Sequence, residues 1–311
     1  MERESNKLAI VIPVYKSAFL QEALNSIASQ TNKNFTLYIG NDNSPEDIYS
    51  TVKKYENDLD IIYKKFDENL GNISIVKHWK RCVEMTNAEE WIWLFSDDDM
   101  MSEDCVELFF QAIEKTSGNY DLYRFNCSII DKAGKQLTNK SGYPEIQSSF
   151  EFLISRLTYQ YHSYIVNCIF SRTVFLKNNG FVDFKAAWAA DDATWILYGQ
   201  DKKIFTLNVG EVKWRQSSIN ISGNTKNLQN RRNKYEGTAQ FISWVYNWSL
   251  RNKIQVDDKI VIKWFFTMLE SIGYRYVSWT YIKSKTFRTF FLKGNYVYQL
   301  KSIRSNLHRK F

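Results

Sequence analysis

The chain has 311 residues, of which only three are Pro and twelve are Gly, so it can form a large core, and low-complexity disorder is excluded. No run approaches the roughly 18 uncharged apolar residues of a membrane span, and the N-terminal MERESNK lacks an apolar signal core. The four cysteines form no C-x-x-C pair, which favours reduced thiols in a cytoplasmic protein.

The net charge of +7 is unevenly distributed along the chain. Residues 225–311 hold 17 Lys and Arg against 4 Asp and Glu, whereas residues 1–224 hold 24 against 30. Such an asymmetry indicates that the two parts have different surroundings. We therefore expect two domains, residues 1–224 and a basic, aromatic-rich helical region at residues 225–311.

Apolar runs alternate with helical patterns through the first hundred residues. Strands are expected at residues 8–14, 35–40, 61–66 and 91–95, and helices at residues 19–30 and 73–85. This alternation predicts βαβ units with a parallel sheet, hence an α/β fold. Ser44 and Pro45 have the pattern of an N-cap and a first helical residue. Lys77 and Arg81 share a helix face that we expect to be solvated, although either could reach a bound nucleotide.

The second half of the chain shows a less regular pattern. Strands are expected at residues 120–130, 165–170 and 203–207, and a helix at residues 150–158. A further helix starts with Asp191 and Asp192 in its first turn, where carboxylates are favoured. Residues 213–223 form a polar segment, and helical patterns dominate from residue 230.

Three consecutive carboxylates, Asp97, Asp98 and Asp99, follow the buried strand at residues 91–95. Adjacent negative charges repel one another, and burying them unpaired is costly. A hard cation such as Mg²⁺ or Mn²⁺ removes this cost, and it is often held by one or two carboxylates plus substrate phosphates. The alternative is a solvated acidic loop that caps the next helix at Ser102.

Parallel strands joined by right-handed crossovers place the loops that follow them at one edge of the sheet. We therefore expect residues 13–15, 42, 69–71 and 97–99 to surround one crevice. Neither G-x-G-x-x-G nor G-x-x-x-x-G-K-[ST] occurs. Without a Gly-rich phosphate cradle, a diphosphate needs another source of positive charge, which is a second argument for a metal ion.

These pieces together resemble the family 2 glycosyltransferases, inverting enzymes of the GT-A fold. The resemblance covers about residues 7–224. Its motifs are I-V-I-P-V-Y at residues 10–15, N-D-N-S at 41–44, E-N-L-G at 68–71, S-D-D-D at 96–99 and D-D-A-T-W at 191–195. It implies a Rossmann-like, mostly parallel sheet flanked by helices.

The resemblance also implies roles for individual residues. Asp42 would bind the nucleotide base, Asp97 would lie near the ribose or the sugar, and Asp99 would hold the metal ion. Asp192 corresponds to the family's catalytic base. The residues assigned to the donor nucleotide are Pro13, Val14, Tyr15, Asp42, Asn69, Gly71, Asp97, Asp98 and Arg215.

The sequence departs from the family pattern at three places. Ser96 replaces the first Asp of the common D-x-D-D pattern, so the aspartate that contacts the ribose stays open. Asp191 replaces the usual Glu beside the base, which keeps Asp191 as an alternative base. The family's late His is absent, and Arg215 is a candidate phosphate ligand in its place, with an ordinary surface salt bridge as the alternative.

Transfer with inversion requires a carboxylate that takes the proton of the acceptor hydroxyl and a separate positive charge for the leaving diphosphate. The expected reaction moves a sugar from a nucleoside-diphosphate sugar, a UDP-sugar by resemblance, to a glycan or polyprenyl-linked glycan in cell-surface polysaccharide synthesis. Two alternatives stay open. One is a nucleotidyltransferase on a similar sheet, and the other is a non-catalytic protein that binds a membrane surface or nucleic acid.

Residues 225–311 combine positive charge with many aromatic residues, among them Trp264, Phe265, Phe266, Tyr274, Tyr276, Trp279 and Tyr281. Aromatic residues at helical spacing usually form a core. The alternative is peripheral contact with anionic lipid at the inner face of the cell membrane. Nucleic acid ranks last as a partner, because no RNP-like or helix-turn-helix signature is present.

Overall fold

The computed structural model describes residues 7–217 and 228–272. The chain divides into two compact units, residues 1–224 and residues 225–311. The sheet and all the site residues predicted from the sequence belong to the first unit.

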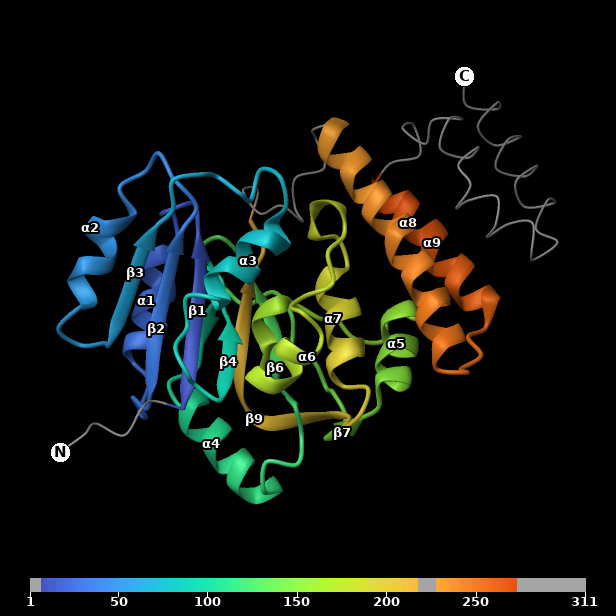
Figure 1. Cartoon of the computed structure of the whole chain (residues 1–311), viewed down its shortest axis with the longest axis horizontal. Coiled ribbons are helices and arrows are strands. Elements are labelled where there is room, and N and C mark those ends of the chain that lie inside the picture. Colours follow the sequence, from blue (N-terminus) through green and yellow to red (C-terminus); the bar gives the residue numbers. More distant parts are fainter. Residues whose placement is uncertain (1–6, 218–227, 273–311) are drawn as a thin grey trace. The chain divides into compact units, whose positions relative to one another are not determined.

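Four parallel strands form the first part of the sheet (Figure 1). β1 (Leu8–Val14) pairs with β2 (Phe35–Asn41) on one side and with β4 (Trp91–Leu94) on the other, and β3 (Ile61–Lys65) pairs with β2. Every residue of β1, β2 and β4 is buried except Pro13, which is half-buried. Such continuous apolar strands are typical of a parallel sheet that is covered on both faces. The predicted α/β fold class is confirmed.

The second part of the sheet is mixed. β8 (Cys168–Ser171) runs antiparallel to both β4 and β6 (Leu122–Ile130). β9 (Ile204–Arg215) is parallel to β6 and antiparallel to two short strands, β5 (Met100–Met101) and β7 (Ile146–Gln147). The strand order is β3-β2-β1-β4-β8-β6-β9-β5, with β7 paired to β9.

Two predicted strands differ in extent from the structure. The segment predicted as a strand at residues 165–170 begins as a 3-10 turn, η2 (Ile165–Asn167), and becomes extended only at Cys168. β9 continues to Arg215, where a polar segment was expected from Lys213. Lys213 pairs with Ser128 of β6 and with Met100 of β5, so sheet neighbours on both sides override the polar composition.

Helices of the first unit connect these strands. They are α1 (Leu20–Ala28), α2 (Ile48–Val52), η1 (Lys53–Tyr55), α3 (Ile75–Val83), α4 (Cys105–Thr116), α5 (Ser149–Leu157), α6 (Arg172–Lys177), η3 (Lys185–Ala187) and α7 (Ala190–Tyr198).

The predicted N-cap at Ser44 is wrong. α2 begins at Ile48, and the side chain of Asp47 caps it by accepting a hydrogen bond from the Ser50 N–H at 3.2 Å. The Ser44 Oγ instead donates to the carbonyl of Tyr15 at 2.7 Å and accepts from the Glu46 N–H. A tertiary contact between two loops has therefore replaced the local cap.

Aromatic packing fixes the end of β4. Trp93 stacks on Phe125 of β6 with 5.4 Å between ring centroids, and its Nε1 donates to the carbonyl of Val166 at 2.7 Å. Trp91 meets Tyr123 edge-on at 5.3 Å. Because close-packed interiors resist displacement, β4 presents the residues that follow it in one defined position.

The second unit contains α8 (Leu228–Arg251) and α9 (Asp258–Ile272). Their facing sides are aromatic, with 5.1 Å between the ring centroids of Phe241 and Trp264. Trp264 and Phe265 are buried, as the core interpretation predicts. The aromatic residues at 274, 276, 279 and 281 lie outside the described residues. Among the helices in the described part of the chain, none is both long and apolar enough to span a bilayer.

Candidate functional site

The acid loop, residues 96–99, follows β4 directly. Asp99 is 1% exposed, and its Oδ1 accepts a hydrogen bond from the backbone N–H of Arg215 at 2.7 Å. Burial and the charge of Asp98 raise the pKa of Asp99 well above its ordinary value. Burial and the same neighbour raise the pKa of Asp97 to about 7, and burial raises that of Asp98. A positive charge at this loop would stabilise all three carboxylates.

Hydrogen bonds join the acid loop to the segments that follow β1 and β2. Asp97 Oδ2 accepts from the Tyr15 N–H at 3.3 Å. The Ser44 hydroxyl reaches the carbonyl of Tyr15, and the Asp42 N–H donates to the carbonyl of Val14 at 2.9 Å. Residues that the sequence placed after three different strands therefore lie together at one edge of the sheet.

The carboxylate of Asp42 closes the loop that follows β3. Its Oδ1 accepts from the Leu70 N–H and its Oδ2 from the Gly71 N–H, both at 2.8 Å. Arg81 of α3 pairs with the same carboxylate, and its guanidinium lies 3.9 Å from the centroid of the Phe66 ring. Gly71 has no room for a side chain, because a Cβ there would lie 2.5 Å from Asp42 Oδ2.

Two further side chains complete this part of the site. Asn69 Oδ1 accepts from the Asn72 N–H at 3.0 Å and so holds the turn that contains Gly71. His78 accepts at Nδ1 from Arg81 Nε at 3.0 Å. Burial lowers the pKa of His78 to about 4, so this imidazole is neutral at physiological pH.

Arg215, which was predicted to contact a donor phosphate, is fully buried. Its Nε donates to the carbonyl of Asp98 at 2.8 Å, and its Nη2 donates to the carboxylate of Glu22 at 2.6 Å. Its Nη1 donates to the carbonyls of Asp131 and Lys132 at 3.3 and 3.2 Å. Because every guanidinium nitrogen is hydrogen-bonded within the protein, we infer that Arg215 positions the acid loop instead of contacting a phosphate.

The second acid group is Asp191 and Asp192 in the first turn of α7. The backbone just before them is left-handed at Ala186, Ala187 and Ala189, with φ values of 58°, 52° and 59°. Left-handed conformations cost energy for residues other than Gly, and such strain clusters at binding and catalytic sites.

Asp192 is 4% exposed and forms a bidentate ion pair with Arg156 of α5. Arg156 Nε lies 2.7 Å from Oδ1, and its Nη2 lies 3.1 Å from Oδ2. Arg156 also donates to the carbonyl of Tyr161. Asp191 is only partly buried. Burial and repulsion from Asp192 raise the pKa of Asp191 to about 7, and the charge of Arg156 opposes this rise.

The phenol of Tyr164 interacts electrostatically with Asp99 and with Arg156, the partner of Asp192. Burial raises the pKa of Tyr164, and the charges of Arg156 and Asp99 act on its phenol in opposite directions. The Tyr164 ring stacks on Trp214 with 4.4 Å between centroids, and Trp214 immediately precedes Arg215. One aromatic side chain thus lies within electrostatic reach of Asp99 and of the arginine that pairs with Asp192.

The acid loop has the donor chemistry of a hard-cation site. Within residues 7–217 and 228–272, no group of three or more His, Cys, Asp or Glu side chains is arranged to hold a metal ion. The loop nevertheless offers carboxylate oxygens in a buried setting where repulsion raises their proton affinity. This set fits a divalent cation that completes its coordination with substrate phosphates and water.

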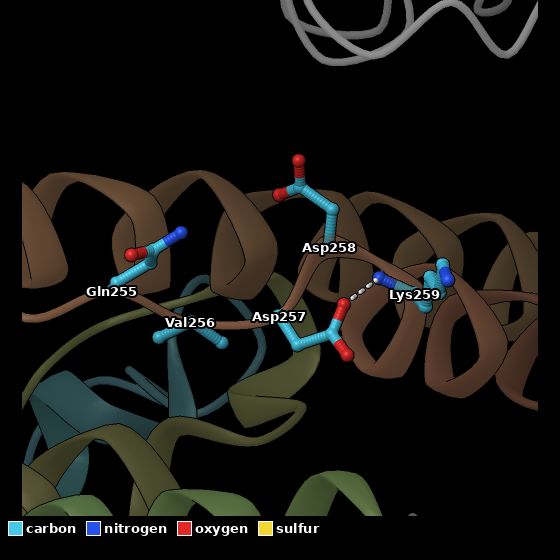
Figure 2. Close-up of a pocket in the computed structure, with 5 residues that line it drawn as sticks. All are labelled: Gln255, Val256, Asp257, Asp258 and Lys259. Atoms are coloured by element: carbon cyan, nitrogen blue, oxygen red, sulfur yellow. Dashed lines mark hydrogen bonds between the residues drawn. The ribbon is translucent and has the colours of Figure 1, made fainter.

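A hollow in the second unit is lined by Gln255, Val256, Asp257, Asp258 and Lys259, in the segment between α8 and the start of α9 (Figure 2). Asp257 Oδ1 accepts from the Lys259 N–H at 2.8 Å, which is a helix-capping arrangement. Asp258 Oδ1 accepts from the hydroxyl of Tyr246 at 2.7 Å. Local structure therefore accounts for both acids, and no predicted site residue lines this hollow.

Two arginine side chains of the site were not predicted correctly from the sequence. Arg81 was expected on a solvated helix face, and Arg156 was not singled out. A signal for Arg156 existed, because it lies four residues after the buried Phe152 on the apolar face of the predicted helix. A charged residue at such a position indicates a buried partner.

The chain is similar to glycosyltransferases in sequence and in fold. A family model described as Glycosyl transferase family 2 matches residues 9–176. An uncharacterized glycosyltransferase of Rickettsia typhi is 23% identical over 231 residues, which cover 74% of this chain and 69% of the relative. The structure of S. aureus TarS 1-349 in complex with UDP-GlcNAc has a TM-score of 0.64 at 18% identity, over 91% of this chain and 77% of that chain. A mannosyltransferase from Pyrobaculum calidifontis in complex with GDP-Man and Mn²⁺ has a TM-score of 0.52 at 11% identity, over 97% and 80% of the two chains.

Proposed function

Because the chain belongs to glycosyl transferase family 2, we propose that it is an inverting enzyme that moves a sugar from a UDP-sugar to a hydroxyl of a glycan or a lipid-linked glycan. The family and the fold make it a glycosyltransferase that uses a nucleotide sugar. The observation that carries the finer proposal is the presence of two separate acid groups in the first unit, the acid loop after β4 and the pair Asp191 and Asp192 in the first turn of α7. Inverting transfer needs one group at the leaving diphosphate and another at the attacking hydroxyl.

The donor nucleotide is proposed to bind where the segments after β1, β2 and β3 meet. The supporting observation is the hydrogen-bonded cluster of Asp42 with the backbone of Leu70 and Gly71, which pre-organises this edge. Arg81 joins the residues predicted from the sequence, because it pairs with Asp42. UDP is favoured because the S. aureus TarS structure contains UDP-GlcNAc, and GDP is the alternative because the Pyrobaculum enzyme contains GDP-Man.

Asp99 would hold Mg²⁺ or Mn²⁺, and Arg215 would keep the acid loop in place. When bound, such an ion supplies Lewis-acid stabilisation of the negative charge on the leaving diphosphate. The raised pKa of Asp99 and the oxygen-only donors of the acid loop support this role. The pair Asp191 and Asp192 would supply the carboxylate that takes the proton of the attacking hydroxyl.

Calorimetric titration with UDP, in the presence and absence of Mn²⁺, tests the donor proposal. We expect UDP to bind, and to bind at least about tenfold more tightly with Mn²⁺, which corresponds to about 1.4 kcal/mol. UDP release from a panel of UDP-sugars then tests turnover and identifies the sugar. If neither UDP nor GDP bound in either condition, the proposed function would be wrong.

The acceptor and the site of action are proposed from charge. Residues 225–311 contain 17 Lys and Arg but only 4 Asp and Glu, and this positive charge suits peripheral contact with an anionic membrane. A polyprenyl-linked glycan of a cell-surface polysaccharide would be presented at such a membrane. Sedimentation of the full chain with vesicles tests this. Binding to anionic vesicles should exceed binding to neutral ones and should fall with added salt, whereas equal binding to both would contradict it.

A further inference from the structure

We propose that the exposed ring of His162, backed by Tyr164 and Trp214, is the surface on which an uncharged sugar ring of the acceptor stacks. We call these three side chains the aromatic row. This inference rests on the proposed function, in which the acceptor is a glycan or a lipid-linked glycan. It gives that acceptor a binding surface and a chemical class.

The aromatic row consists of three nearly parallel rings. Tyr164 stacks on Trp214 with 4.4 Å between the ring centroids and 11° between the ring planes. The His162 ring lies 6.2 Å from that of Tyr164, with 19° between the planes. Tyr164 and Trp214 are partly buried against the core, whereas His162 is exposed. The row therefore runs from the core to the surface and ends in a ring that a ligand can reach.

Hydrogen bonds hold the backbone of His162 in place. The carbonyl of His162 accepts from the hydroxyl of Tyr143, and the carbonyl of Tyr161 accepts from Arg156. Tyr143 is only 4% exposed, and its ring meets that of Tyr161 edge-on with 5.3 Å between centroids. A side chain on a fixed backbone loses little freedom when a ligand binds, so the row is a pre-formed surface.

The two ends of the aromatic row are connected to the two acid groups. At the core end, Trp214 directly precedes Arg215, which donates hydrogen bonds to the acid loop. At the surface end, His162 follows the residue whose carbonyl accepts from Arg156, the partner of Asp192. A sugar that stacked on His162 would therefore bind near the acid pair of α7, where the proposed reaction requires the attacking hydroxyl.

The charge of the aromatic row favours an uncharged ligand. Partial burial and the charge of Arg156 lower the pKa of His162, so its ring is neutral at physiological pH. Every guanidinium nitrogen of Arg156 donates a hydrogen bond within the protein. The face of an aromatic ring carries partial negative charge, and the C–H groups of a sugar ring carry partial positive charge because each carbon is bonded to oxygen. The row therefore suits the C–H face of a neutral sugar and does not suit a phosphate or an acidic sugar.

Three substitutions of His162 separate stacking from hydrogen bonding. His162→Phe keeps a flat ring and removes the polar atoms, His162→Gln keeps polar atoms and removes the ring, and His162→Ala removes both. Because His162 is exposed, all three variants should fold. Tyr49→Leu is the control, because Tyr49 is an aromatic residue of α2 that is 43% exposed and lies outside the aromatic row.

The experiment measures binding of the full chain, in the presence of UDP and Mn²⁺, to an array of neutral and acidic oligosaccharides. We expect the wild type, His162→Phe and Tyr49→Leu to bind neutral oligosaccharides. His162→Gln and His162→Ala should bind them about tenfold more weakly. With a bound oligosaccharide as acceptor and a UDP-sugar as donor, His162→Gln should raise the KM for the acceptor and leave the KM for the UDP-sugar unchanged.

The two proposals fail in distinguishable ways. If the wild type bound UDP but bound no oligosaccharide, or only acidic ones, this inference would be overturned. Equal affinity of His162→Gln and the wild type for neutral oligosaccharides would also overturn it, as would an equal loss of affinity in His162→Phe and His162→Gln. Circular dichroism and UDP titration with Mn²⁺ establish that each variant is folded and binds the donor nucleotide. If the wild type bound no nucleotide, the proposed function itself would be wrong.

Discussion

Substitution of Gly71 by Ala adds one methyl group at the edge of the sheet where the donor nucleotide is proposed to bind, and so tests the geometry of that edge. The φ angle of Gly71 lies outside the left-handed region, so Ala can adopt its backbone conformation. The added Cβ would lie 2.5 Å from Asp42 Oδ2. An ordinary contact between heavy atoms is about 3.5 Å, so the two groups must separate by about 1 Å.

Asp42 cannot turn away at low cost, because its carboxylate is buried between the Leu70 N–H and Arg81. A shift of this size breaks the 2.8 Å hydrogen bond from the Gly71 N–H to Asp42. Hydrogen bonds to charged groups contribute about 1.5–3 kcal/mol, and we expect Gly71→Ala to destabilise the fold by this amount. If Asp42 contacts the base, UDP affinity should fall by at least about tenfold.

Gly142→Ala is the matched control. Gly142 also lies outside the left-handed region, and no heavy atom lies within 4 Å of a Cβ built there. Replacing Gly by Ala at a compatible position stabilises a protein by about 0.4–1 kcal/mol through the unfolded state. The two variants should therefore change stability in opposite directions. Urea titration followed by tryptophan fluorescence gives both values, and calorimetry gives UDP affinity. Equal stability and equal UDP affinity for the two variants would refute the steric reasoning.

Three further predictions concern the charged residues. Arg215→Met should destabilise the fold by about 3–5 kcal/mol, because it leaves several carbonyl acceptors without a hydrogen bond. Urea unfolding measures this change, and a loss of stability below about 1 kcal/mol would contradict the buried geometry of Arg215. Asp99→Ala should remove most of the Mn²⁺ enhancement of UDP binding in calorimetry while metal-free binding is retained, and an unchanged enhancement would place the ion elsewhere. Burial and Asp192 raise the pKa of Asp191 from 3.8 to about 7, so its contribution to stability is fully present below about pH 4 and is lost as pH rises through 7. Asp191→Asn should therefore flatten the fall in stability over this range, by at most about 4 kcal/mol in urea titrations, and a slope identical to that of wild type would contradict the raised pKa.

The sequence contained enough information for the parallel part of the sheet, β1 to β4, and for the place of the acid loop at the end of β4. β1 and β4 are continuous apolar runs, so their burial can be predicted without knowing which elements pack against them. Because strands of a parallel sheet end at one edge, the meeting of residues 15, 42 and 97 also followed from pattern alone.

Side-chain partners across long sequence separations could not be predicted in the same way. Arg215 was expected at a phosphate or in a surface salt bridge, but its hydrogen bonds go to Glu22 and to carbonyls at residues 98, 131 and 132. No local pattern specifies these acceptors. The prediction that Ser44 is an N-cap was wrong for a related reason. Capping rules consider only neighbours in sequence, whereas the Ser44 hydroxyl donates a hydrogen bond to the carbonyl of Tyr15 in another loop.

The hydrogen bond from the Arg215 N–H to Asp99 spans 116 residues of sequence. Contacts of such separation form late in folding, because a long loop must close before they are gained. During synthesis, a nascent chain in which β9 has not yet been made can already form the pairings among β1, β2, β3 and β4. Its acid loop still lacks the hydrogen bond from the Arg215 N–H. The contribution of a metal ion at the acid loop to nucleotide binding should therefore be acquired only when β9 docks, later than the cluster of Asp42 with Leu70 and Gly71.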